Sequence, residues 1–160
     1  MAETAADIST QWCRFGELSA AALYELLRFR QQIFVVEQCS PYPDLDGHDA
    51  AAAHLLLRCD GELAGYLRVV PSPSDIRIGR VAVGAPLRGR GLGRRLMAEA
   101  LGFYRERHPA LPVVLTAQHH LIRFYQSFGF AATSEPFDDF GLVHIAMRRA
   151  CGSRKEEIDG

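Results

Sequence analysis

Residues 81–96 constrain the fold of this chain more than any other segment. An apolar strand pattern leads into the loop Arg88-Gly89-Arg90-Gly91-Leu92-Gly93. Its alternating glycines let the backbone approach a ligand closely and adopt conformations that other residues avoid. Leu96 and Ala100 continue a helical spacing behind the loop, so the loop also opens a helix, where free N–H groups and the helix dipole favour an anion. The sequence therefore predicts a strand, an anion-binding loop and a helix in that order.

Other loops that bind phosphates or nucleic acid have a different spacing. A P-loop ends in Lys followed by Ser or Thr, and Arg94-Arg95 stand in that place here. A dinucleotide-binding unit carries an acidic residue about 20 residues further on, where residues 111–115 contain none. An RNA-binding tail rich in Arg and Gly is long and repetitive, whereas this run is short and lies between two apolar segments. The loop is therefore predicted to belong to a folded domain.

Composition favours a single globular domain without a membrane span. A chain of 160 residues with 48% hydrophobic residues can bury a sizeable core. No stretch approaches the roughly 20 apolar residues of a membrane helix, and the N-terminus lacks a signal-peptide pattern. The net charge of −1 argues against whole-surface binding to nucleic acid or anionic lipid. We therefore expect a cytoplasmic protein with neither nucleic acid nor a membrane as its partner.

The order of apolar patterns predicts a mixed α/β sheet with helices on both faces. Asp60-Gly61 is a hairpin turn signal between two of the strands. The domain is predicted to span residues 10–150, between a flexible N-terminus at 1–9 and a disordered tail at 151–160. We expect strands at residues 10–16, 54–59, 62–70, 75–83, 113–117, 130–134 and 142–147, and helices over 18–34, from the glycine loop to 107, and from 118 through 128.

Charge is segregated along the chain. One cluster surrounds the glycine loop and suits an anionic cofactor, whereas the other lies in an earlier loop and suits a cationic amine. A solvated loop with Asx turns is the alternative for the acidic cluster, and the sequence leaves both open. The basic cluster comprises Arg77, Arg80, Arg88, Arg90, Arg94 and Arg95, and the acidic one Glu37, Asp44, Asp46 and Asp49.

Three segments resemble the GNAT superfamily of N-acetyltransferases. The run 88–93 matches its Arg/Gln-x-x-Gly-x-Gly/Ala signature and follows the strand at 79–83. Residues 118–130 resemble its later helix, which ends in an aromatic-Tyr-x-x-x-Gly-Phe pattern, and residues 29–49 resemble its ElaA-like branch. The resemblance spans roughly residues 10–149. It implies one domain with a mixed, mostly antiparallel sheet of about seven strands, about four helices and splayed central strands.

The resemblance also implies acyl transfer from acetyl-CoA to a primary amine of a small molecule or a protein, by direct attack in a ternary complex. Backbone groups of the strand would pair with the pantetheine arm, and N–H groups of the loop would hold the pyrophosphate. Gln118, where the superfamily often has Asn, would contact the cofactor from the other side. The cofactor-binding residues expected on this basis are Val81, Ala82, Val83, Arg88, Gly89, Arg90, Gly91, Leu92, Gly93, Arg94 and Gln118. Monomer and homodimer are both left open.

Amine attack needs a base, because a free alkyl ammonium has a pKa near 10.4. The strand before the loop lacks the Glu that many relatives carry there, so Glu37, which follows an apolar run, is the predicted base. His48, His54 and a water relay are left open as alternatives. Tyr125 stands at the motif position where the superfamily's Tyr faces the cofactor sulfur, and is expected to protonate the departing thiolate.

The acceptor is expected to meet Asp46, His48 and His144, although a satisfied core histidine is the alternative for the last. His119-His120 are adjacent rather than one helical turn apart, so no metal site is predicted. Two other functions are left open. A CoA-binding sensor without catalysis is favoured by the missing strand Glu. An acyl-homoserine-lactone synthase is favoured by residues 27–37 and the acids that follow, although the chain is shorter and lacks the tryptophan after the acidic residue.

Overall fold

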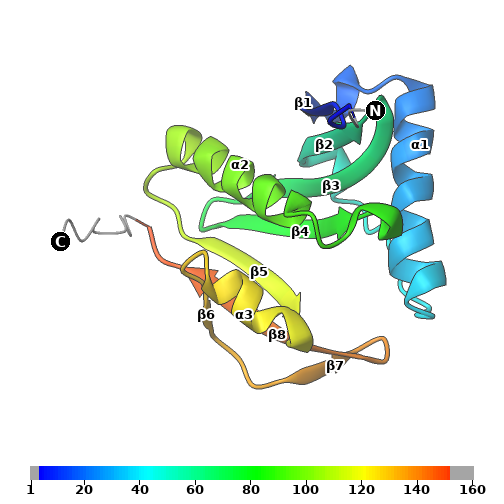
Figure 1. The fold of residues 1–160 in the computed structure, drawn as a ribbon. Helices are drawn as coiled ribbons and strands as arrows, with labels where there is room; N and C mark the ends of the chain where they lie inside the picture. Colours follow the sequence, from blue (N-terminus) through cyan, green and yellow to red (C-terminus); the bar gives the residue numbers. More distant parts are fainter. Residues whose placement is uncertain (1–3, 152–160) are drawn as a thin grey trace.

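The computed structural model describes residues 4–151. These residues form one sheet with the order β1-β2-β3-β4-β5-β8-β6, and β7 also pairs with β8 (Figure 1). Within them β4–β5 is the one parallel pair, so the predicted mixed, mostly antiparallel α/β sheet is confirmed. The strands are β1 (Ile8–Arg14), β2 (Ala53–Cys59), β3 (Glu62–Pro71), β4 (Ile76–Val83), β5 (Val113–Gln118), β6 (Ala131–Ala132), β7 (Phe137–Asp139) and β8 (Leu142–Arg149).

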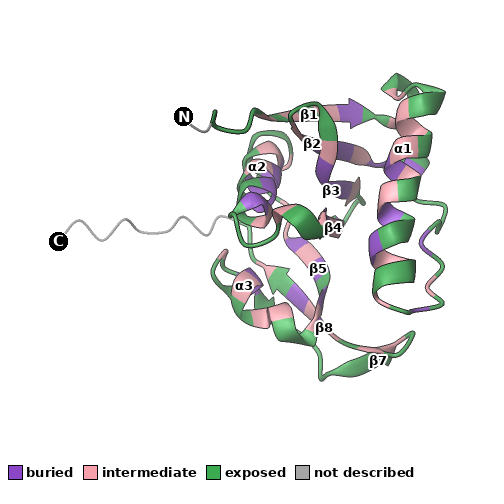
Figure 2. Cartoon of the chain, turned by 45° about the vertical axis from the view of Figure 1, so that its right-hand side comes forward, coloured by how far each residue is buried: buried purple, intermediate pink, exposed green. Residues whose placement is uncertain are grey.

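Helices cover both faces of the sheet (Figure 2). Leu55 and Leu57 belong to the large core with α2 and α3, whereas Leu56 lies between them in sequence and packs with Leu26 of α1 on the opposite face. This alternation is the period of a strand that is buried on both sides. The α-helices are α1 (Ala20–Gln31), α2 (Leu92–Arg107) and α3 (Ile122–Gln126), and a π-helical turn, Gln32–Glu37, continues α1.

The ends of α1 differ from the prediction. Ser19 caps its N-terminus by accepting a hydrogen bond from the Ala22 N–H at 3.0 Å. At the other end the helix widens into the π-helical turn up to Glu37, a local irregularity that often accompanies functional sites. The expected Asp60-Gly61 turn is present, with φ of 50° and 84°, as a two-residue hairpin turn of this kind requires.

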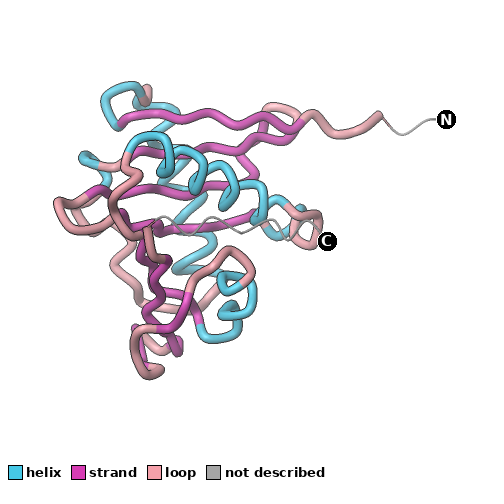
Figure 3. Tube along the Cα trace, turned by 90° about the vertical axis from the view of Figure 1, so that its left-hand side faces the viewer, coloured by secondary structure: helices cyan, strands magenta, loops and turns pink. Residues whose placement is uncertain are grey.

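The sheet divides between β4 and β5. These strands pair only at Ile76 with Val113 and at Arg77 with Val114, and beyond that point they separate. Figure 3 shows the result as two groups of strands that run in different directions. The predicted splay of the central strands is therefore present, and it opens a gap along the second half of β4.

A bulge in β4 accompanies the splay. Tyr66 pairs with Ala82 and Arg68 with Gly79, so two residues of β4 oppose one of β3. Arg80 lies in the bulge with φ of 55°, a left-handed conformation that non-glycine residues rarely adopt. A bulge bends its strand and increases the local twist, so it turns the second half of β4 away from β5.

The two predicted ends of the chain are only partly described. Strand β1 begins at Ile8, earlier than expected, within the segment predicted to be flexible. Residues 1–3 and all of the predicted tail except Cys151 lie outside the described residues. Within the described part of the chain, no helix is long and apolar enough to cross a membrane.

Candidate active site

The glycine loop presents unpaired backbone donors at the start of α2. Gly89 and Gly91 have φ of 80° and 77°, and Gly91 is the N-cap of α2. The first N–H group of α2 to find a backbone acceptor is that of Arg95, which donates to the Gly91 carbonyl at 3.1 Å. The N–H groups of residues 89–94 have no acceptor among the described residues. A Cβ at Gly89 or Gly91 would meet nothing within 4 Å. Free donors beside open space at a helix N-terminus form an anion site.

A cavity of about 380 Å³ lies over this loop, lined by Val83, Leu87, the loop itself and Phe124 of α3. Arg94 extends over the rings of Phe124 and Phe128, with its Cζ 5.7 and 5.4 Å from their centroids. Its charge is therefore held between α2 and α3, beside the cavity. The loop, the arginine and the aromatic wall together suit a ligand that carries both phosphate and apolar parts.

Arg88 makes contacts within the protein. Its Nε donates to the Val83 carbonyl at 2.9 Å, and its Nη1 pairs with the Glu37 carboxylate at the end of the π-helical turn. Arg88 therefore ties the glycine loop to the segment after α1. Two predicted site residues are thus engaged with each other, and Glu37 lines neither of the two cavities.

The second half of β4 borders the gap and carries two of the predicted cofactor-binding residues, Val81 and Val83. The Gly84 N–H donates to the Ala64 carbonyl of β3 at 2.8 Å. Because hydrogen-bonded pairs alternate in an antiparallel ladder, Ala82 also pairs toward β3, and the polar groups of Val83 point away from it. The Val83 carbonyl is taken by Arg88. The N–H of Val83 then faces the gap, and Val81 lies in the bulge, where the ladder is interrupted, and lines the larger cavity.

A second cavity, of about 560 Å³, lies between the two halves of the sheet. It is bounded by β3 and β4 on one side, by β5, β7 and β8 on the other, and by residues 34–48. The structure brings together six of the predicted site residues as its lining, namely Val81, Gln118, Tyr125, Asp46, His48 and His144. The two cavities lie at successive positions along β4, since Val81 lines one and Val83 the other.

Tyr125 reaches the larger cavity from α3. It is buried, and edge-on rings of Phe124 and Phe130 lie 5.0 and 6.2 Å from its ring. Its hydroxyl makes no hydrogen bond within the described residues. Burial raises the pKa of Tyr125 to about 12, because the charged phenolate is poorly solvated there. The hydroxyl is therefore protonated at neutral pH and free to donate into the cavity.

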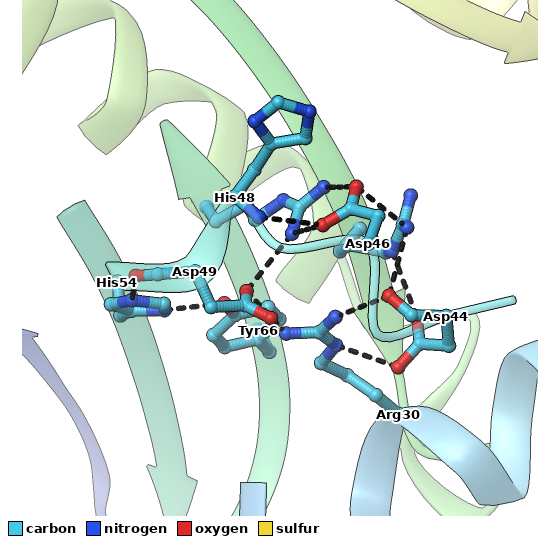
Figure 4. Close-up of polar contacts among 9 residues, drawn as sticks. Arg30, Asp44, Asp46, His48, Asp49, His54 and Tyr66 are labelled. Atoms are coloured by element: carbon cyan, nitrogen blue, oxygen red, sulfur yellow. Dashed lines mark hydrogen bonds and ion pairs between the residues drawn. The ribbon is translucent and has the colours of Figure 1, made fainter. Parts of the chain in front are cut away.

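The acidic loop does not form the open, acidic entrance that its sequence suggested. Arg30 donates to Asp44 at 3.0 Å from Nε and to Asp49 at 2.7 Å from Nη1 (Figure 4). Arg68 binds both Asp46 and Asp49, the latter at 2.9 Å. The side chain of Arg30 is fully buried and that of Arg68 is 6% exposed. The segment is therefore neither a solvated loop nor a free acidic cluster, because arginines of the protein already bind its aspartates.

Arg80 completes this ion-pair network, which comprises Arg30, Arg68, Arg80, Asp44, Asp46 and Asp49. It lies 2.8 Å from Asp44 and 3.1 Å from Asp46, and its guanidinium stacks over the Tyr42 ring at 4.7 Å. These contacts offset the cost of its left-handed backbone. Arg80, which the sequence grouped with the glycine loop, is therefore engaged by the acidic loop instead.

Two carboxylates of the network, those of Asp46 and Asp49, are held ionised. Burial alone would raise the pKa of Asp46, but hydrogen bonds from Arg68 and the His48 N–H hold it well below its usual value. Burial also opposes ionisation of Asp49, and Arg30 and Arg68 lower the pKa of that carboxyl. With three arginines against three aspartates, the network is neutral, so it offers no net negative charge to an amine.

The histidines differ in what they offer. His54 is fully buried, with Nε2 at 2.8 Å from the Asp49 carbonyl and Nδ1 at 2.6 Å from the Tyr66 hydroxyl. Burial lowers the pKa of His54, and both ring nitrogens are satisfied, so it is a core residue and not a base. His144, by contrast, lines the cavity with Nδ1 2.9 Å from the Leu142 carbonyl. Since Nδ1 donates there, Nε2 of the neutral ring is left as an acceptor.

Comparison with known proteins identifies the family. A model of the GNAT acetyltransferase domain matches residues 26–151. The chain belongs to the GNAT acetyltransferase family. It is 42% identical to the protein ElaA of Escherichia coli K12 over 147 residues, which are 89% of this chain and 96% of ElaA.

Solved GNAT structures agree with this assignment. The crystal structure of E. coli ElaA superposes with a TM-score of 0.85 at 41% identity, covering 89% of this chain and 99% of ElaA. A structure described as an acyl-CoA N-acyltransferase from Pseudomonas aeruginosa superposes with a TM-score of 0.85 at 37% identity. The match covers 90% of this chain and 100% of the Pseudomonas chain. The GNAT family uses acyl-CoA, whose pyrophosphate is an anion of the kind that the free N–H groups of residues 89–94 suit.

Proposed function

We propose that this protein transfers the acetyl group of acetyl-CoA to a primary amine by direct attack in a ternary complex. The observation that carries the proposal is the pair of cavities along β4. One lies over an anion-binding loop, and the other is lined by a buried tyrosine whose hydroxyl has no hydrogen-bond partner among the described residues. A donor bound along the gap would have its phosphates at one end and its thioester at the other, where an amine can enter.

The donor would be oriented by backbone groups rather than by charge. The N–H groups of residues 89–94 would bind the pyrophosphate, and Val81 and Val83 would pair with the amides of the pantetheine arm. Backbone donors are fixed by the fold before binding, so little ordering is needed. Gln118, at the end of β5, lines the facing wall of the gap and is proposed to contact the donor from there.

Tyr125 is proposed as the acid. The amine nitrogen attacks the thioester carbonyl and forms the new C–N bond, and the C–S bond then breaks. The departing thiolate needs a proton, and the Tyr125 hydroxyl lines the cavity and shares its proton with no described residue. An N–H of the β4 strand facing the gap would donate to the oxyanion that forms between these steps.

The proton of the amine must leave by a base. Glu37 remains the base predicted from the sequence, and its pairing with Arg88 outside the larger cavity gives it no support. His48 and His144 line that cavity, and the Nε2 acceptor of His144 makes it the better geometric candidate. Replacing Glu37 by Gln and His144 by Gln in turn separates the two, because only loss of the base removes the acidic limb of the profile of kcat against pH.

Calorimetric titration with acetyl-CoA, with dephospho-CoA and NAD as controls, tests the donor site. Release of free thiol across a panel of amines then tests transfer. We expect acetyl-CoA to bind and release to depend on the amine. Binding without release from any amine would favour a CoA-binding sensor, a function to which the missing strand carboxylate points. No binding would overturn the donor assignment.

A further inference from the structure

The hairpin of β7 and β8 presents one face to the larger cavity. Phe137 pairs with His144 and Asp139 with Leu142, so these four side chains lie on the same face of the hairpin. All four line the cavity, whereas Asp138 and Val143, on the opposite face, do not. This face is a wall of the acceptor side, built by a strand that the sequence pattern did not reveal.

The hairpin is fixed in place by the loop that carries the acidic residues. The buried Ser40 donates from Oγ to the Phe140 carbonyl at 2.8 Å, and the ring of Tyr42 meets that of Phe140 edge-on at 5.6 Å. Phe140 and Gly141 form the turn with φ of 51° and 86°. A left-handed phenylalanine is strained, and such strain persists only where the surroundings impose it. The position of Asp139, next to this turn, is therefore well determined.

Asp139 is the unpaired carboxylate of the cavity. Of the three carboxylates that line it, Asp46 is bound by Arg68 and Arg80, and Asp75 accepts from the Ser72 hydroxyl at 3.1 Å. The carboxylate of Asp139 makes no hydrogen bond or ion pair with any residue that the structure describes. A half-buried carboxylate in a cavity, without a partner, is suited to a cation supplied by a ligand.

Position along the strand separates Asp139 from the reacting centre. His144 pairs with Gln118 at the end of β5, and Leu142, the partner of Asp139, lies two residues before His144 at the start of β8. At about 3.4 Å per residue this is a displacement of roughly 7 Å. The distance suits the reaction, because a carboxylate beside the attacking nitrogen would stabilise its ammonium form and oppose attack.

We infer that Asp139 binds a second, non-reacting ammonium group of the acceptor, so that the preferred acceptors are short diamines rather than monoamines. This inference rests on the proposed transferase function, in which the other nitrogen attacks the thioester. The ring of Phe137 on the same face adds a surface that attracts cations. The sequence suggested the acidic loop as the site for a cationic amine, but three arginines neutralise the charge of that loop. Asp139 is the carboxylate that would bind the ammonium group instead.

The test measures both binding and turnover for two probes of matched length, the diamine putrescine and the monoamine n-butylamine. Binding is measured by titration into protein saturated with CoA, and turnover by thiol release from acetyl-CoA. The variant is Asp139→Asn, and the matched control is Asp138→Asn, in the same hairpin but outside the cavity. A hydrogen bond to a charged group is worth about 1.5–3 kcal/mol, so we expect Asp139→Asn to weaken putrescine binding and lower its kcat/KM by about tenfold or more.

We further expect n-butylamine to change less than twofold, and Asp138→Asn to behave as the parent for both probes. Equal binding of the two probes by the parent, or a loss in Asp139→Asn that is the same for both, would overturn the role of Asp139. Selective loss of putrescine binding without thiol release from either parent or variant would support the ammonium site and overturn the transferase instead. The two proposals therefore fail by different measurements.

Discussion

The glycine loop and the acidic loop are both rich in charged and turn-forming residues, but they use their polar groups in opposite ways. The N–H groups of residues 89–94, at the start of α2, have no acceptor in the described part of the chain. In the acidic loop, three carboxylates are bound by three arginines with distances of about 3 Å, and two of these arginines are almost fully buried. Polar groups that are satisfied internally hold a structure together, whereas preorganised groups without partners are available to a ligand.

The largest effect expected from this contrast is on stability. Replacing Arg30 by Met leaves Asp44 and Asp49 without the cation that joins them, and removing one member of a buried ion pair costs about 3–5 kcal/mol. The control is Arg58→Met, which breaks the exposed pair with Glu25 at 2.7 Å and should cost less than about 1 kcal/mol. Urea denaturation measures both. Equal costs would mean that the network contributes no more than a surface pair.

The next effect is on catalysis. Changing Tyr125 to Phe removes a hydroxyl that has no hydrogen-bond partner within residues 4–151, so stability and acetyl-CoA affinity should be unchanged while kcat falls by about 100-fold or more. Tyr104→Phe is the matched control, because Tyr104 is also buried with an unpaired hydroxyl but lines neither cavity. Steady-state thiol release at saturating donor compares them. A Tyr125→Phe variant with the turnover of the parent would remove the proposed acid.

A smaller effect is expected at the anion-binding loop. Gly91→Ala places a side chain in a left-handed conformation at a cost of roughly 1–2 kcal/mol. We expect the free loop to relax out of this conformation, so that restoring it on binding weakens the affinity for acetyl-CoA by up to about tenfold. Gly102→Ala, in the middle of α2 with open space around it, should bind as the parent does and gain about 1 kcal/mol of stability. Calorimetry distinguishes them. If Gly91→Ala bound as tightly as the parent, the loop conformation would not matter for the donor.

The smallest effect is a pH dependence of stability. Burial lowers the pKa of His54, so below the ordinary histidine pKa of about 6.5 the unfolded chain binds a proton that the folded chain does not. The free energy of unfolding should therefore fall with pH from about 6.5 downward, by at most about 1.4 kcal/mol per pH unit. His54→Gln should flatten this slope, whereas His120→Gln, at an exposed position, should keep it. Denaturation at several pH values gives the slopes, and equal slopes in the two variants would contradict this role of His54.

Much of the fold follows from local patterns. The alternation in β2, the hairpin turn at residues 60–61 and the loop that opens α2 each depend on a few neighbouring residues. The strand pattern missed β7, because Phe137–Asp139 is too short to show alternation. It also missed the π-helical turn after α1, which no propensity distinguishes from a continuing helix.

The sequence by itself determined the family, the anion-binding loop and the tyrosine that α3 carries, because each is encoded in a short run of adjacent residues. Only the tertiary structure decided which charges meet. The partners of Asp44 and Asp46 lie 14 to 36 positions away along the chain. Asp139 lies on β7, which pairs with β8, and its carboxylate meets no cation among the described residues. The role of a charged side chain depends on the groups that lie next to it in the fold. Those groups come from distant segments of the chain, so local sequence does not determine them.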